Sequence, residues 1–167
     1  MQGMTALELL TVMLVISILL AVSVPSFADL TQRNRILSEV NGFVADLQFA
    51  RSEAIRQGLP VIVCVSSNGS TCSGNSRWHE GWIVFVDANS NTAFDSGEPV
   101  MRYQRAWEST DTFVASGTKS LIAYNRDGFA SGLGGARFTA NTTPVNAGAA
   151  RCVTVSIVKT PSGGTCP

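Results

Sequence analysis

Residues 3–27 read GMTALELLTVMLVISILLAVSVPSF, and this stretch decides the fold of the chain. The run from Leu9 to Ala28 holds twenty residues without a formal charge, mostly Leu, Val, Ile, Met and Ala. As a helix it spans about 30 Å, which is the thickness of the hydrocarbon core of a bilayer. One carboxylate, Glu8, stands at the start of this run. Because a charge is costly in lipid, a carboxylate at this position indicates a functional role.

This stretch resembles the N-terminus of type IV pilins and of type II secretion pseudopilins. In those families a leader ends in Gly, an apolar residue follows, and a Glu stands five residues after the Gly. Here these are Gly3, Met4 and Glu8. Pro25 stands where the family has a helix-bending proline.

The alternative for this segment is a secretory signal peptide or a plain membrane anchor. A signal peptide has a basic start and a small-x-small cleavage site after its apolar run. Met1 and Gln2 carry no side-chain charge, although residues 21–23 (AVS) or 26–28 (SFA) offer a weak cleavage site. This alternative leaves Glu8 unexplained, so we favour the pilin-like interpretation.

The resemblance implies a processing route and four segments. Residues 1–3 are the prepilin leader, 4–28 the transmembrane or filament-core half of the first helix, 29–58 its amphipathic half, and 59–167 the globular head. Prepilin peptidase is expected to cleave between Gly3 and Met4 and to methylate the new α-amine of Met4. The protein is then expected in the bacterial inner membrane as a single-pass protein with its head in the periplasm, and later in the pilus at the cell surface.

Glu8 has a specific role in this interpretation. A carboxylate in a lipid-like filament core is stabilised by an opposite charge. The α-ammonium of Met4 on the neighbouring subunit is the expected partner, and this pair sets the axial register of assembly. The alternative is an interfacial Glu8 whose carboxylate reaches water.

The pattern after Pro25 predicts an amphipathic continuation of the same helix. Apolar residues recur at steps of three and four, which marks one helical face: Ile36, Val40, Phe43, Val44, Leu47, Ala50 and Ala54. Gly58 and Pro60 are a stop signal, since Gly favours the position after a helix and Pro cannot continue it. One helix is therefore predicted from about Met4 to Gln57, bent near Pro25.

From Leu59 onward the sequence pattern is that of β-strands. Residues become β-branched, with period two, over six predicted strands: 61–66, 82–87, 100–104, 121–125, 137–140 and 152–158. Asp127-Gly128 predicts a hairpin turn. The predicted fold class is α+β and pilin-like, with one long N-terminal helix packed on a mostly antiparallel β head.

The head is similar to the FimT/GspH-like minor pilins and the H-type pseudopilins. Members often have a Cys-flanked loop, a Gly-Trp-aliphatic strand and an Asp/Asn-rich turn that ends in Gly-Glu. Here these are Cys64–Cys72, 81–85 and Asp87–Glu98. The resemblance implies a minor pilin of the type IV pilus in assembly or priming, with other minor and major pilins as partners. The alternative is an H-type pseudopilin of type II secretion.

Four cysteines behind an export segment indicate disulfides in an oxidising compartment. Three pairings are possible, and we favour the local one, Cys64–Cys72 with Cys152–Cys166, because it closes only two small loops. A zinc site is the alternative, but its ligands usually stand two to four residues apart within a pair, and neither pair has that spacing.

The segment 87–98 has oxygens at the spacing of a calcium-binding loop. The candidate ligands follow EF-hand positions one, three, five, nine and twelve: Asp87, Asn89, Asn91, Asp95 and Glu98. Thr92 stands where the sharp turn requires Gly, and the flanks are predicted strands rather than helices. A β-hairpin loop capped by its own Asn and Asp side chains explains the same residues, so calcium is the less favoured prediction and no other cofactor is expected.

DNA binding is a further alternative, because some FimT-like minor pilins bind DNA through a Gly-Arg-x-Arg stretch near the C-terminus. The corresponding region, 155–164, offers only Lys159. The remaining candidate contacts are Arg102, Arg105, Arg137 and Arg151. With 12 basic and 12 acidic residues the chain has no bulk charge that attracts DNA, so such binding is expected to be weak and salt-sensitive.

Catalysis has little support in the sequence. His79 is the only histidine of the chain, and no nucleophile motif or paired metal ligands accompany it. We therefore expect a protein that works by assembly and is not an enzyme.

Overall fold

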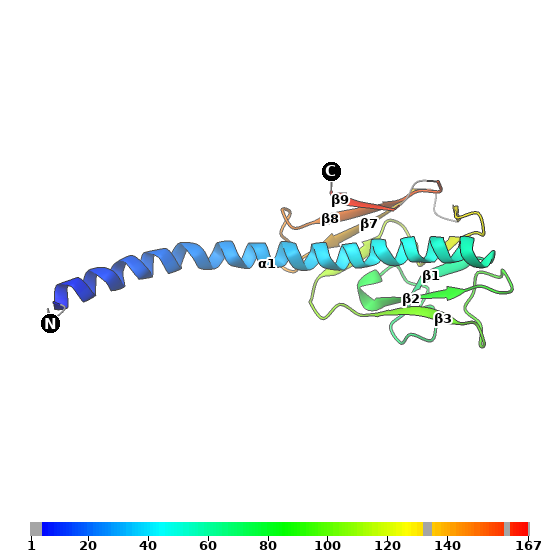
Figure 1. Cartoon of the computed structure of the whole chain (residues 1–167), viewed down its shortest axis with the longest axis horizontal. Helices are drawn as coiled ribbons and strands as arrows, with labels where there is room; N and C mark the ends of the chain where they lie inside the picture. The colour runs from blue at the N-terminus through cyan, green and yellow to red at the C-terminus, as the bar shows by residue number, and fades with distance from the viewer. Residues whose placement is uncertain (1–4, 132–134, 159–160, 167) are drawn as a thin grey trace.

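The computed structural model describes residues 5–131, 135–158 and 161–166, without the side chains of residues 22–26. One long helix is followed by a β head, as the sequence predicts (Figure 1). The elements in chain order are α1 (Ala6–Gln57), β1 (Val61–Val65), the short 3-10 helix η1 (Trp78–Glu80), β2 (Gly81–Val86), β3 (Val100–Arg105), β4 (Thr112–Ala115), β5 (Leu121–Tyr124), β6 (Ala130–Ser131), β7 (Ala136–Asn141), β8 (Arg151–Val155) and β9 (Ser162–Thr165).

Helix α1 has 52 residues and a defined signal at each end. Thr5 is the N-cap, in extended conformation. At the other end Gly58 adopts the left-handed conformation (φ 67°) and donates its N–H to the carbonyl of Ala54 at 3.0 Å, which confirms the predicted stop. The helix runs without a break through position 25, and its N-terminal part curves away from the line of its C-terminal half (Figure 1).

The head contains two antiparallel sheets. The first has the strand order β3-β2-β1-β5-β6 and the second β4-β7-β8-β9. Every pairing between these strands is antiparallel, which confirms the predicted sheet type. Both sheets contact the C-terminal half of α1, which lies along the head. Residues 125–129 form the turn of the β5–β6 hairpin, as Asp127-Gly128 predicts.

Phe43 lies at the centre of the main core. Its ring makes edge contacts with Trp78, Trp82 and Phe113 at centroid distances of 4.9–5.2 Å, and a tilted contact with Phe138 at 5.1 Å. The predicted apolar face of α1 is buried against both sheets, except that Val44 is only partly buried. The alternation of side chains along a strand explains the second, smaller cluster: on the outer face of the first sheet it contains Ile62, Cys64, Ile83, Phe85 and Ala123.

The N-terminal half of α1 extends alone beyond the head (Figure 1). Its apolar side chains are exposed on all sides, with exposed fractions from 45% at Val12 to 74% at Leu7. Within the part of the chain that the structure describes, none of the helical stretches combines the length and apolarity of a bilayer-crossing segment.

Candidate assembly site

Glu8 lies in the first turn of α1, where it forms a capping box with Thr5. The Thr5 N–H donates to Glu8 Oε2 at 2.9 Å and its hydroxyl donates to the same oxygen at 3.0 Å. In return the Glu8 N–H donates to Thr5 Oγ1 at 3.3 Å. This arrangement satisfies backbone donors that a helix start otherwise leaves without partners. Thr5 has no role in the sequence prediction, although Thr-x-x-Glu ahead of an apolar run is the signature of this cap.

The rest of the predicted processing site lies outside the described residues. This applies to Gly3 and Met4, and to the side chain of Pro25. Next to Glu8 the helix surface is apolar and exposed, with Leu7 at 74% and Leu10 at 68%. Among the described residues around this point, the Glu8 carboxylate is therefore the charged group on an apolar surface, and the Thr5 and Thr11 hydroxyls lie beside it.

An ion pair fastens α1 to the head near the place where the helix leaves it. Arg35 donates to Asp111 through Nε at 2.7 Å and Nη2 at 2.9 Å, and the Thr143 N–H donates to the same carboxylate at 3.2 Å. The Asp111 side chain is only 1% exposed. Burial alone would raise the pKa of Asp111, but these hydrogen bonds, with one from Ser109, hold it below its ordinary value. Nothing in the sequence pattern singles out Asp111.

Glu39 lies one turn beyond Arg35 on the same helix. Burial, together with the negative charges of Asp111 and Glu108, raises the pKa of Glu39 above its ordinary value. This end of the head therefore carries more negative charge than Arg35 balances.

The arginines considered for DNA binding do not form one surface. Arg102 donates to Asp46 at 2.7 Å and lies 3.7 Å from the centroid of the Phe49 ring, so α1 already holds its charge. Arg105 lies on β3 in the other sheet from Arg137 and Arg151.

Strand register separates the last two arginines. Arg137 is paired with Thr154 and Arg151 with Ala140, and the alternation along β7 places these pairs on opposite faces of the sheet. The Arg151 guanidinium donates to the carbonyl of Ala150 at 2.8 Å. Lys159 lies outside the described residues. The described geometry offers no shared phosphate-binding surface for this set.

The loop between β2 and β3 is held by its own amides. Asp87 is buried and accepts the N–H groups of Asn91 and Thr92 at 3.1 and 2.9 Å. Asp95 accepts the side-chain amides of Asn89 and Asn91, which lower its pKa. Glu98 accepts the N–H groups of Ala88 and Asp95, each at 3.0 Å.

These hydrogen bonds favour the self-capped hairpin loop over the calcium site. Each carboxylate of the loop already has donors, and no group of three His, Cys, Asp or Glu residues in the described part of the chain is arranged to hold a metal ion. Calcium binding remains a prediction from sequence spacing alone.

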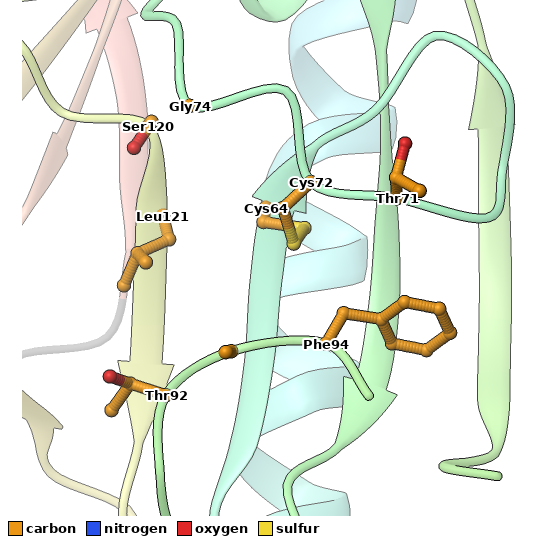
Figure 2. Close-up of a pocket in the computed structure, with 9 residues that line it drawn as sticks. Cys64, Thr71, Cys72, Gly74, Thr92, Phe94, Ser120 and Leu121 are labelled. Atoms are coloured by element: carbon orange, nitrogen blue, oxygen red, sulfur yellow. A yellow bond between two sulfur atoms is a disulfide. The ribbon is translucent and has the colours of Figure 1, made fainter. Parts of the chain in front are cut away.

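Both favoured disulfides are formed. Cys64 in β1 is bonded to Cys72 in the following loop, and Cys152 in β8 to Cys166 beyond β9. The first disulfide borders a pocket of about 350 Å³ over the outer face of the first sheet (Figure 2). Phe94 and Leu121 supply the apolar lining, and hydroxyls such as Ser120 the polar part. No acid, base or histidine is among its lining residues, so the pocket provides no catalytic group.

Comparison with known proteins identifies the family of this chain. A family model described as type II transport protein GspH matches residues 39–159, which is well over half of the sequence. The chain belongs to the GspH family. The matched range starts in the amphipathic half of α1 and runs past β8, so it includes the whole first sheet and every strand of the second sheet except β9.

The GspH-family fold is also found in solved structures. Two crystal forms of the type IV minor pilin FimU from Pseudomonas aeruginosa match with TM-scores of 0.61 and 0.59, at 18% and 16% sequence identity. The first match covers 82% of this chain and 92% of FimU, the second 77% and 91%. At such identity the likeness shows the fold alone. No curated protein gives a significant match.

These findings confirm the predicted pilin-like fold and the minor pilin or pseudopilin group. Members of this group are structural subunits that associate with other pilins. In such a protein the functional sites are contact surfaces, and the first half of α1 exposes many apolar side chains.

Proposed function

We propose that this GspH-family chain is a minor pilin of the type IV pilus, which takes part in pilus assembly and priming. The observation that carries the proposal is the projecting half of α1, whose side chains are apolar and exposed on all sides. A helix that is apolar all round is stable only when lipid or other subunits cover it. The inner membrane covers it before assembly, with the head in the periplasm, and neighbouring helices cover it in the filament.

Glu8 has two successive roles in this proposal. In the single chain it caps α1 through Thr5. Prepilin peptidase cleaves after Gly3 and methylates Met4, which leaves an α-ammonium one residue before the cap. In the filament the Glu8 carboxylate pairs with the Met4 ammonium of the neighbouring subunit, because each charge stabilises the other where water is absent.

Mass spectrometry of the protein from sheared filaments tests the processing route. We expect an N-terminal peptide that starts at Met4 and carries one additional methyl group on its α-amine. A filament protein that retains residues 1–3 would contradict the proposal.

A second candidate is the H-type pseudopilin of type II secretion, because the matching family model bears the description of a type II transport protein. The two candidates share the fold and the processing route, so only the cellular machine differs. Deletion of the gene separates them: the minor pilin predicts loss of twitching motility with normal secretion, and the pseudopilin predicts the reverse.

A further inference from the structure

A group of exposed apolar side chains lies on the head near the C-terminal end of α1. Ile55 is on α1, Phe129 is in the β5–β6 turn, and Ile157 and Val158 follow β8. Their exposed fractions are 55%, 42%, 52% and 64%. We name these four residues, with Arg51, the seam patch. Exposed apolar side chains that gather in one region of a protein surface indicate a contact surface.

Direct contacts bring the three segments together. Ile55 Cδ1 lies 2.7 Å from the position that a Cβ would occupy at Gly128. The Ile55 side chain therefore packs directly against the backbone of this turn. The Ala130 N–H donates to the carbonyl of Ile157 at 3.0 Å, which joins the edge of the first sheet to the segment after β8. Because a side-chain contact and a backbone hydrogen bond join these segments, the seam patch is formed before any partner arrives.

Arg51 gives the seam patch a positive charge that lacks an acidic partner. Its guanidinium makes one long hydrogen bond, 3.5 Å, to the carbonyl of Val158. No carboxylate of the described residues lies within 4.0 Å of it, although the other α1 arginines all have one. Beneath it the Tyr124 hydroxyl is buried without a hydrogen-bond partner in the described part of the chain. Burial raises the pKa of Tyr124 to about 12 while the Arg51 charge opposes that rise, so this hydroxyl stays neutral and the patch keeps its positive charge.

The charge also limits what can occupy the patch. A second copy docked by a twofold axis would bring two positively charged copies of the same patch together without supplying a carboxylate from the patch residues, which is unfavourable. Glu8, beside Leu7 and Leu9, is one acid of this chain next to exposed apolar residues, but its cap with Thr5 already holds it. Asp29, beside Phe27 and Leu30, is another. It already accepts the amide of Asn146 at 2.9 Å and pairs with Arg33 at 4.0 Å, so a head-to-tail copy is a poor match.

We infer that the seam patch docks a different pilin-like subunit, which presents aliphatic or aromatic side chains around one carboxylate. The apolar side chains cover Ile55, Phe129, Ile157 and Val158, and the carboxylate accepts from Arg51. This inference rests on the proposed function and names one contact within it. Charge-assisted pairing of this kind fixes which neighbour docks and in which orientation.

Photo-crosslinking in cells that make the full chain tests this inference. Benzoylphenylalanine is placed at Val158, and as a control at Val145, which is 77% exposed but lies in the loop that contacts α1 near Asp29. We expect an adduct from position 158 with one other pilin-like subunit, mapped by mass spectrometry to a peptide that contains a carboxylate. Position 145 is expected to give no adduct with that peptide.

Charge variants then identify the role of Arg51. Arg51→Glu is expected to reduce the adduct at least about tenfold, since replacing a paired charge by its opposite costs at least about 1.4 kcal/mol, which is a factor of ten in affinity. Arg51→Gln, which keeps a donor for the Val158 carbonyl, is expected to reduce it less. Arg126→Glu, an exposed arginine of the same turn, is the matched control and is expected to leave it unchanged.

Three results would overturn the inference. The first is an adduct of equal amount in Arg51→Glu and the parent protein. The second is an adduct with a second copy or with a protein outside the pilin group, and the third is the absence of any adduct when processed protein is present in filaments. Absence of the processed protein from filaments would instead contradict the proposed function, so the two failures are distinguishable. Equal protease resistance of the Arg51→Gln and parent heads shows that the fold is kept.

Discussion

At the scale of single residues, the contacts of charged groups divide this chain into two parts. Where α1 packs on the head, Arg35 of the helix and Arg102 of the head are held by carboxylates of the other part, and these contacts stabilise the fold. On the projecting helix, the contacts of Glu8 with described residues are those of its own cap. We therefore expect charges at the head to affect stability, and we propose that the Glu8 charge affects assembly.

Asp111→Asn is expected to lower the free energy of unfolding by about 2 kcal/mol at pH 7, because a buried acceptor for Arg35 and the Thr143 N–H loses its charge. Urea unfolding measures this effect. Glu108→Gln, at an exposed carboxylate, is the control and is expected to change stability by less than about 0.5 kcal/mol.

The same pair predicts a pH dependence. The pKa of Asp111 is lower in the folded state than in the unfolded chain. Its contribution to stability is therefore full above the unfolded pKa of about 3.9 and is lost as the pH falls through the folded pKa. The stability difference between the parent protein and Asp111→Asn should shrink below about pH 4. A difference that stays constant from neutral to strongly acidic pH would contradict this account.

A single residue could be predicted where the sequence around it carries a recognisable pattern. Glu8 is predictable because it interrupts an apolar run, and its partner Thr5 stands at a recognisable capping distance. Asp111 is not predictable, since it is 76 positions away from Arg35 and lies in a Ser/Thr-rich loop without periodicity. The seam patch is equally hidden, because the contacts that join its three segments are long-range.

At the scale of elements, long periodic segments were predicted and short ones were not. The helix and six strands follow from apolar periodicity, while β4, β6 and β9 were not predicted. β9 has the sequence SGGT, which contains no apolar residue, and all four residues are exposed. Its strand conformation comes from pairing with β8 and from the Cys152–Cys166 disulfide rather than from its own preference.

Replacement of both Cys152 and Cys166 by Ser is expected to lower the free energy of unfolding by about 3 kcal/mol, because the unfolded chain gains the freedom of a loop of this length. Hydrogen exchange should show that the β9 amides lose protection before those of β7. If the double variant keeps parental protection in β9, strand pairing alone holds this strand and the argument above is wrong.

Two glycines allow the cost of a positive φ to be distinguished from the cost of steric crowding by an added Cβ. Gly58 and Gly81 both have positive φ, but a Cβ at Gly58 meets nothing within 4 Å, whereas at Gly81 it would lie 2.6 Å from the Gln104 carbonyl and 2.8 Å from that of Ser66. Gly58→Ala is expected to cost about 1 kcal/mol. Gly81→Ala must also move backbone between β2 and β3, so its cost should be at least twice as large in thermal unfolding. Equal costs would contradict the crowding at Gly81.

At the scale of the whole molecule, the chain joins a folded head to an apolar rod that cannot be covered by its own residues. The main core is completed by the C-terminal half of α1, so the head is stable around one half of the helix while the other half remains available. In the proposed function this division has a purpose: burial of the apolar half of α1 drives assembly, and the head presents surfaces such as the seam patch to neighbouring subunits.

The amount of Glu8→Gln protein in sheared filaments tests the central claim most directly. Gln at this position keeps the capping box with Thr5 but carries no charge. Thr5→Ala is the matched variant, since it weakens the cap by about 1 kcal/mol and keeps the Glu8 charge. We predict that Glu8→Gln is processed at the N-terminus but about tenfold depleted from filaments, as expected for a lost ion pair away from water, while Thr5→Ala is incorporated nearly as well as the parent. Full incorporation of Glu8→Gln, with loss of Thr5→Ala, would show that Glu8 serves only its own helix and would contradict the account.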